Sequence, residues 1–349
     1  MSELTLWYTR CPIPTALGLA AQNGLIDQSF ADKHEINVCS LREAADEQVR
    51  NSHYTHTQPG SFRHGGSYPA IWARANGADT RVIGLSTMPA STPQTILTLS
   101  ESALHAAADL KGRRILLLRR PQAVFDFHYF NSLRTLDMAL ASTGLTRADV
   151  TIVEHVATPG TRQPDGPAKQ RDALLLPATL FPLVRGEVDA IIAGVTRALD
   201  LRRNFGLRKL FDQADLPLAQ QGHNGRPLTL TVDGALVRDR PDIVRRLLGS
   251  VLQAERSIAA DPQAAVLRYA RDFAISEQVS AHLYGGTLID DVHVDFRADR
   301  TAALQNEVDF LFAAGAIPRR FDVETWLVRD FLAELRGEAG THEPAPMFA

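Results

Sequence analysis

Apolar and polar residues alternate along the first part of the chain in a way that predicts strands separated by helices. Residues 4–8 alternate with every second residue apolar, and further strands are predicted at 35–39 and 80–85. Residues 11–24 are typical of a helix, with Pro14 in its first turn and Gly24 at its C-terminal cap. Strands that alternate with helices favour parallel pairing, and we therefore expect an α/β lobe here.

A second set of elements follows from residue 94 onward. A strand is predicted at 94–99 and a turn and strand at 109–118. A helix at 136–141 and a strand at 149–155 follow, and residues 181–194 predict a short helix before a buried strand. A polar stretch rich in Pro and Gly at 158–170 predicts a long loop. This alternation indicates a second α/β lobe.

The chain crosses between the lobes twice in this interpretation, near 95–99 and 228–232. From residue 241 onward apolar residues recur at helical spacing, and the helices they predict should pack on the first lobe. We thus expect lobe one to contain residues 1–97 plus 230–349, and lobe two residues 98–229. Two crossings predict a hinge and an interlobe cleft, which is where α/β proteins bind ligands.

Composition narrows the class of protein. The 349 residues are 45% hydrophobic and 22% charged, as in ordinary globular proteins, and the net charge of -3 gives no electrostatic basis for binding nucleic acid or anionic lipid. Two cysteines are too few for a disulfide framework. There is no recognisable secretory signal and no run of about 18 apolar residues, so we expect a cytoplasmic protein that does not cross a membrane.

Cys11 stands where a predicted strand ends and a predicted helix begins. A helix start lowers the pKa of a thiol and attracts anions, so this position suits a reactive cysteine. It equally suits a small buried apolar residue. Cys39 lies in an apolar strand and is predicted to belong to the core.

Residues 52–66 are unusually dense in polar chemistry for what the pattern predicts to be a loop. Arg63 offers a planar fork of donors for a sulfinate or carboxylate, and Gly65 and Gly66 allow backbone amides to approach the same oxygens. The segment therefore predicts an anion pocket, with a solvated surface loop as the alternative.

Other interpretations of this segment have less support. His53, His56 and His64 could converge on zinc, but their spacing matches no known zinc motif and Arg63 would oppose a cation. The chain has no glycine-rich nucleotide-binding motif. Tyr54, Phe62 and Trp72 could line a pocket, although aromatic residues at such spacing are more often core.

Two segments carry a resemblance to a known family. They are residues 8–17, Tyr-Thr-Arg-Cys-Pro-Ile-Pro-Thr-Ala-Leu, and residues 53–66, with the pattern His-Tyr-Thr-x-x-Gln-Pro-x-x-x-Arg-x-Gly-Gly. In both, the chain resembles the 2'-hydroxybiphenyl-2-sulfinate desulfinases, which catalyse the last step of dibenzothiophene desulfurisation. Similar landmarks occur at residues 108–115, 181–190, 310–312, 322–326 and 331–332.

The resemblance implies a periplasmic-binding-protein-like (type II) fold, and a hydrolase that cleaves the carbon–sulfur bond of a small aromatic sulfinate without cofactor or metal. It further implies a monomer. The catalytic residues that it implies are Cys11, His53 and Arg63. The substrate-binding residues that we expect are Gly65, Gly66, Tyr54 and His56. The sequence departs from the family's pattern in the second lobe, at residues 122–131 and 192–196, which do not clearly reproduce the family's aromatic pocket. Ala193 and Gly194 stand there in place of larger side chains.

Two chemical schemes and two rival functions stay open at this point. The Cys11 thiol either protonates the ring carbon or, as a thiolate, attacks sulfur. The rivals are a solute-binding protein without catalysis, for a ligand with a sulfonate or carboxylate, and another Cys/His enzyme on the same fold, such as a hydrolase or a pyrimidine-synthase-like protein. A hydrolase would need a third group to orient His53, and the sequence offers no clear candidate.

Overall fold

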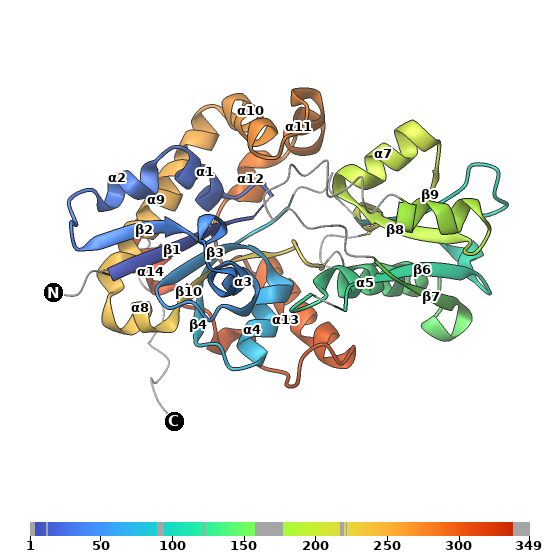
Figure 1. Ribbon diagram of the computed structural model, residues 1–349, viewed down its shortest axis with the longest axis horizontal. Coiled ribbons are helices and arrows are strands. Elements are labelled where there is room, and N and C mark those ends of the chain that lie inside the picture. The colour runs from blue at the N-terminus through green and yellow to red at the C-terminus, as the bar shows by residue number, and fades with distance from the viewer. Residues whose placement is uncertain are drawn as a thin grey trace.

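Two β-sheets, each covered by helices, organise the protein into two lobes (Figure 1). The computed structural model describes residues 4–11, 13–88, 94–121, 123–157, 177–216, 220 and 222–337. The predicted loop at 158–170 lies outside these residues, as does Gln122. The α/β fold with two lobes that the sequence predicts is thus the observed one.

Sheet one forms the core of the first lobe. Its strands, in spatial order, are β2 (Ile36–Ser40), β1 (Leu4–Arg10), β3 (Ser61–Gly66), β10 (Leu228–Asp233) and β4 (Thr80–Ser86). β1 pairs in parallel with β2 and with β3, whereas β10 is antiparallel to both β3 and β4. Because β1 and β3 are parallel neighbours, the segments that follow them leave the sheet at the same edge.

Sheet two forms the second lobe. Its strands, in spatial order, are β7 (Thr151–Val156), β6 (Arg114–Arg119), β8 (Ala190–Gly194), β5 (Gln94–Thr98) and β9 (Arg208–Asp212). β5 pairs with β8 and β9, so residues 94–97 lie in lobe two and not in lobe one as expected. At the other crossing β10 joins sheet one from Leu228, two residues before the expected boundary.

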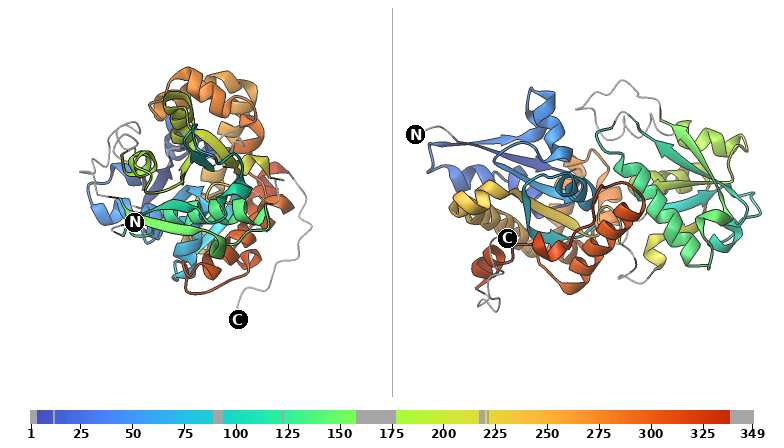
Figure 2. Two further views of the ribbon diagram at one scale, coloured as in Figure 1. Left: turned by 90° about the vertical axis from the view of Figure 1, so that its right-hand side faces the viewer. Right: turned by 90° about the horizontal axis from the view of Figure 1, so that it is seen from below.

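Helices cover both sheets, and the C-terminal ones return to lobe one. The helices of lobe one are α1 (Ala16–Gln22), α2 (Leu25–Phe30), α3 (Glu47–Thr55), α4 (Ser67–Ala75), α8 (Gly234–Asp239), α9 (Pro241–Ala260), α10 (Pro262–Asp272), α11 (Glu277–Tyr284), α12 (Leu288–Val292), α13 (Ala298–Ala313) and α14 (Asp330–Arg336). Lobe two carries α5 (Phe127–Ala141) and α7 (Val195–Phe205). The orange and red helices in Figure 2 accordingly lie with the blue N-terminal elements. Within the described ranges no helix is both long enough and apolar enough to span a bilayer.

Apolar packing explains why the chain returns to lobe one. The apolar face of α9, which includes Ile243, Leu247 and Val251, is buried against α1 and α2 in one cluster with β1. A second cluster combines α4 and α13 of lobe one with α5 of lobe two. The lobes therefore contact each other directly, for instance where the Trp72 and Phe125 rings stack with centroids 5.7 Å apart.

Three local predictions were wrong. The helix expected from residue 11 begins only at Ala16, because Thr15 is its N-cap and accepts a hydrogen bond from the Gly18 amide at 3.0 Å. Gly24 does not end that helix but is the N-cap of α2, with φ of 68°. The polar stretch at 52–66 is not a loop: it contains the end of α3 and all of β3.

Candidate active site

The register of β1 and β3 brings two of the predicted catalytic residues, Cys11 and Arg63, close together. Thr9 pairs with Arg63 across the two strands. Two residues beyond this pair in each segment, Cys11 lies next to Gly65: a Cβ atom placed on Gly65 would be 2.5 Å from the Cys11 Sγ. Since side chains alternate between the faces of a strand, Arg63 and Gly65 share one face while His64 occupies the other.

The thiol of Cys11 is buried and contacts His53. Cys11 is 8% exposed, and its Sγ lies 3.7 Å from the Nε2 of His53, which is in the last turn of α3. Cys11 precedes the N-cap of α1 by four residues, so the expected influence of a helix start on its sulfur is not supported. The His53 imidazole is the ring that contacts this thiol.

Thr9 holds the other nitrogen of that imidazole. Its Oγ1 lies 2.6 Å from the Nδ1 of His53, and the residue is fully buried. Sequence reasoning missed this third group. Its position two residues before Cys11 in a strand was the available signal, because that spacing puts both side chains on one face.

Arg63 is a buried cation between backbone carbonyls. Its Nε donates to the His53 carbonyl at 2.9 Å and its Nη1 to the Gly66 carbonyl at 2.9 Å, while its Nη2 lies 3.2 Å from the place of a Gly65 Cβ. Arg63 is 4% exposed, and burial lowers its pKa. In the described part of the chain the side chains that raise this pKa are those of Cys11 and Tyr54, and no carboxylate is among them.

The histidines near this site are neutral. Burial, together with the charges of Arg63, His56 and Arg42, lowers the pKa of His53 well below its usual 6.5. Burial and Arg63 do the same to the pKa of His56, whose Nε2 is buried without a hydrogen-bond partner in the described ranges. An imidazolium is therefore disfavoured beside Arg63.

The three histidines do not converge on a zinc site. His64 lies on the opposite face of β3, where its Nε2 is 2.8 Å from the Ser86 Oγ, and burial lowers its pKa to about 3. His53 is engaged by Thr9 and Cys11. Among the described residues no group of three His, Cys, Asp or Glu side chains is arranged to hold a metal ion.

The remaining predicted residues line or support the site in different ways. Gly66 ends β3 and is the N-cap of α4. The Tyr54 ring contacts the His53 ring edge-on at 4.7 Å and stacks on Phe127 of lobe two at 6.1 Å. Phe62 is fully buried in the core, so the structure does not place it at the site.

Two earlier interpretations concern residues outside this cluster. Cys39 is half-buried in β2 and is a free thiol, as is Cys11. Trp72, considered as a pocket residue, stacks on Phe125 in the contact between the lobes.

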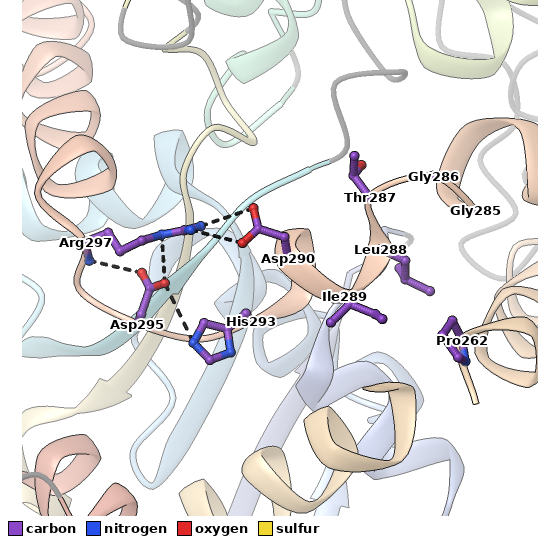
Figure 3. A pocket seen from close by; sticks show the side chains of 10 residues that line it. All are labelled: Pro262, Gly285, Gly286, Thr287, Leu288, Ile289, Asp290, His293, Asp295 and Arg297. Carbon is purple, nitrogen blue, oxygen red and sulfur yellow. Dashed lines mark hydrogen bonds and ion pairs between the residues drawn. The ribbon is translucent and has the colours of Figure 1, made fainter. Parts of the chain in front are cut away.

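A separate hollow of about 740 Å³ lies on lobe one (Figure 3). It is lined by Pro262 at the start of α10, by residues 285–290 and by His293, Asp295 and Arg297, and by none of the predicted site residues. Its arginine is already paired with carboxylates: Arg297 contacts Asp290 and Asp295, each at 3.0 Å. This hollow is therefore not part of the candidate site.

Comparison with known proteins yields relatives along the whole chain. The 2'-hydroxybiphenyl-2-sulfinate desulfinases of Rhodococcus erythropolis and Rhodococcus qingshengii are each 27% identical over 360 residues, which is 94% of this chain and 92% of theirs. No family profile matches the sequence.

Solved structures show the fold. The desulfurization enzyme DszB superposes with a TM-score of 0.71 at 23% identity, covering 96% of this chain and 99% of that one. A Cys-to-Ser variant of DszB, in complex with biphenyl-2-sulfinic acid, gives 0.72. The periplasmic aliphatic sulphonate binding protein of Escherichia coli gives 0.64 at 17% identity, covering 100% of this chain and 97% of that one. The chain thus has the two-lobed fold of periplasmic binding proteins.

Proposed function

We propose that this protein is a desulfinase that hydrolyses the carbon–sulfur bond of an aromatic sulfinate. The observation that carries the proposal is a buried arginine, with no carboxylate partner among the described residues, beside a buried thiol and its histidine. The similarity to the 2'-hydroxybiphenyl-2-sulfinate desulfinases along 94% of the chain supports it. So does the biphenyl-2-sulfinic acid bound to the matched DszB variant.

Arg63 is the anion-binding group in this proposal. A buried charge is costly unless it is paired, and within the described residues Arg63 donates to two carbonyls and has no carboxylate among the groups that raise its pKa. A sulfinate supplies the missing negative charge and two oxygens. Nη2, which is not used toward the two carbonyls, is the nitrogen that donates to the ligand, and the backbone of Gly65 and Gly66 lets the oxygens approach closely.

The reaction then balances without a redox partner. Ar–SO₂⁻ and water give Ar–H and HSO₃⁻: a proton adds to the ring carbon, the electron pair of the carbon–sulfur bond stays with that carbon, and sulfur dioxide leaves and takes up water. Cys11 is the proton donor, and the sulfinate held by Arg63 places the ring carbon at its thiol. Proton transfer by a positioned group contributes about 10²–10⁴-fold, and positioning adds more.

The electrostatics of His53 favour this scheme over attack on sulfur. Nucleophilic attack requires His53 to take the Cys11 proton first, which would create an imidazolium beside the buried Arg63. The lowered pKa of His53 makes that transfer unfavourable. His53 instead orients the thiol through Nε2, while Thr9 fixes the ring through Nδ1. The proton released when sulfur dioxide takes up water restores the thiol after each turnover.

An assay of sulfinate and sulfonate pairs tests the function. Purified protein is mixed with biphenyl-2-sulfinate, benzenesulfinate and the corresponding sulfonates, and both sulfite and arene are quantified. We expect equal amounts of sulfite and arene from the sulfinates and none from the sulfonates. Tight binding of either class with no sulfite would overturn the enzyme assignment in favour of a solute-binding protein.

A further inference from the structure

Asn224 lies beside the proposed sulfinate site although it is about 160 residues away in sequence. It belongs to the segment that enters β10 from lobe two, and its carboxamide takes the space next to the Gly66 Cα. A Cβ atom placed on Gly66 would meet the Asn224 side-chain amide, with Nδ2 at 2.9 Å and Oδ1 closer still. Position 66 therefore needs a glycine because Asn224 is there.

Asn224 also serves as the cap of α4. Gly66, the N-cap residue, has no side chain to accept a hydrogen bond, and the Oδ1 of Asn224 accepts from the Tyr68 amide at 3.0 Å instead. An acceptor at this point satisfies an amide that the helix leaves unpaired. The first turn of α4 begins at the proposed anion site. It is thus stabilised by Asn224, a residue that belongs neither to β3 nor to α4.

Lobe two holds the same segment from the other side. The backbone N–H of Asn224 donates to the Oδ1 of Asn131 at 3.2 Å, and Asn131 is a buried residue of α5. Arg134, one turn further along α5, donates through Nε to the Gly222 carbonyl at 3.3 Å. α5 is the helix that also brings Phe127 against Tyr54.

We propose that Asn224 is a positioning residue that connects α5 of lobe two, through Asn131, to the Gly66 end of the sulfinate site. The connection consists of two hydrogen bonds: the backbone N–H of Asn224 donates to the Asn131 Oδ1, and the backbone N–H of Tyr68 donates to the Asn224 Oδ1. Movement of α5 relative to lobe one thereby changes the geometry of the anion-binding turn. The inference deepens the proposed function and rests on it for the identity of the ligand.

Hydrogen exchange tests the connection without any ligand. The Tyr68 amide should exchange at least tenfold faster in Asn131→Ala than in wild type, although Asn131 does not touch it. Asn131→Asp, which keeps an oxygen acceptor, should restore the wild-type rate, and Ser142→Ala at the exposed end of α5 should not alter it. If Asn131→Ala does not fold, Asn131→Leu is the alternative, because a leucine side chain also lacks the acceptor but fills more of the space that alanine leaves empty. An unchanged Tyr68 rate in the folded Asn131 variant would refute the connection.

Sulfinate affinity tests its consequence. Calorimetry with biphenyl-2-sulfinate in a Cys11→Ser background should show affinity lowered about threefold to tenfold by Asn131→Ala. Asn224→Asp keeps the capping oxygen but adds negative charge beside Gly66, so it should keep the melting temperature and lose at least tenfold in affinity. Wild-type affinity in Asn224→Asp would reduce Asn224 to a helix cap and overturn the proposal. If the background protein binds no sulfinate at all, the proposed function fails, and the exchange experiment still decides the connection.

Discussion

Gly65→Ala is the substitution that most directly probes how closely the site residues approach each other. The new methyl carbon would lie 2.5 Å from the Cys11 Sγ, 3.2 Å from the Arg63 Nη2 and 3.3 Å from the Arg63 Cζ. Non-bonded heavy atoms settle at about 3.5–4.0 Å. The thiol must therefore retreat by about 1 Å, since the guanidinium is held by two carbonyls and cannot give way freely.

The cost should appear in catalysis more than in folding. A displacement of about 1 Å at a reacting group costs about 10²-fold in rate, whereas overpacking a buried site costs about 1–3 kcal/mol of stability. We expect kcat for sulfite release to fall about 100-fold while the protein stays folded by circular dichroism. The matched control is Gly249→Ala in α9, where a Cβ has nothing within 4 Å and where alanine favours the helix.

A small loss would refute the reasoning. If Gly65→Ala releases sulfite within about twofold of the control, a methyl group is tolerated between Cys11 and Arg63, and the two do not form one reaction site.

Three further predictions follow from the same contacts. Thr9→Val removes the hydrogen-bond partner of the His53 Nδ1 and should lower kcat at least tenfold with little change in KM. Thr9→Ser keeps the hydroxyl and should retain most of the activity. Equal rates in the two variants would exclude an orienting role for Thr9. Arg63→Lys should weaken sulfinate binding less than Arg63→Ala, because an ammonium keeps the charge but loses the planar fork, and equal calorimetric affinity in the alanine variant and wild type would exclude the anion pocket. Burial lowers the pKa of His64 and of His223 to about 3 in the folded protein, so between pH 7 and pH 5 these residues take up a proton only on unfolding. The free energy of unfolding should therefore fall as the pH drops below about 6.5, by about 2 kcal/mol per residue between pH 7 and pH 5. Three buried carboxyl groups with raised pKa values, Asp212, Asp291 and Glu307, act in the opposite direction, but the histidines with lowered pKa values outnumber them. Urea titrations that show greater stability at pH 5 than at pH 7 would therefore contradict the assignment.

The elements that sequence reasoning identified are those with uninterrupted apolar patterns. β1, β4 and β10 have regular apolar positions, and α9 has a clear apolar face. β3 was missed because its central residues are Arg63 and His64, which are polar and nevertheless buried. Apolar periodicity cannot reveal a strand when the buried residues on both of its faces are polar.

Local sequence could not reveal the residues that arrive from far along the chain. Cys11, His53 and Arg63 were proposed from motifs; the parallel register of β1 and β3 explains why Cys11 and Arg63 meet, and α3, which precedes β3, supplies His53. Asn224 reaches the site only because β10 inserts between β3 and β4, an arrangement set by long-range strand pairing.

The central claim is that the Cys11 thiol delivers a proton to the carbon that bears sulfur. A direct measurement compares wild type and Cys11→Ser with biphenyl-2-sulfinate in deuterated water, following sulfite, the deuterium content of the biphenyl and the mass of the protein. A hydroxyl is similar in size but a far weaker acid than a thiol, so the variant should fold and bind the sulfinate yet release no sulfite. Wild type should yield biphenyl with one deuterium and carry no sulfur adduct on Cys11. Full sulfite release by folded Cys11→Ser would contradict the account, and an adduct on Cys11 of the wild type would replace proton donation by attack on sulfur.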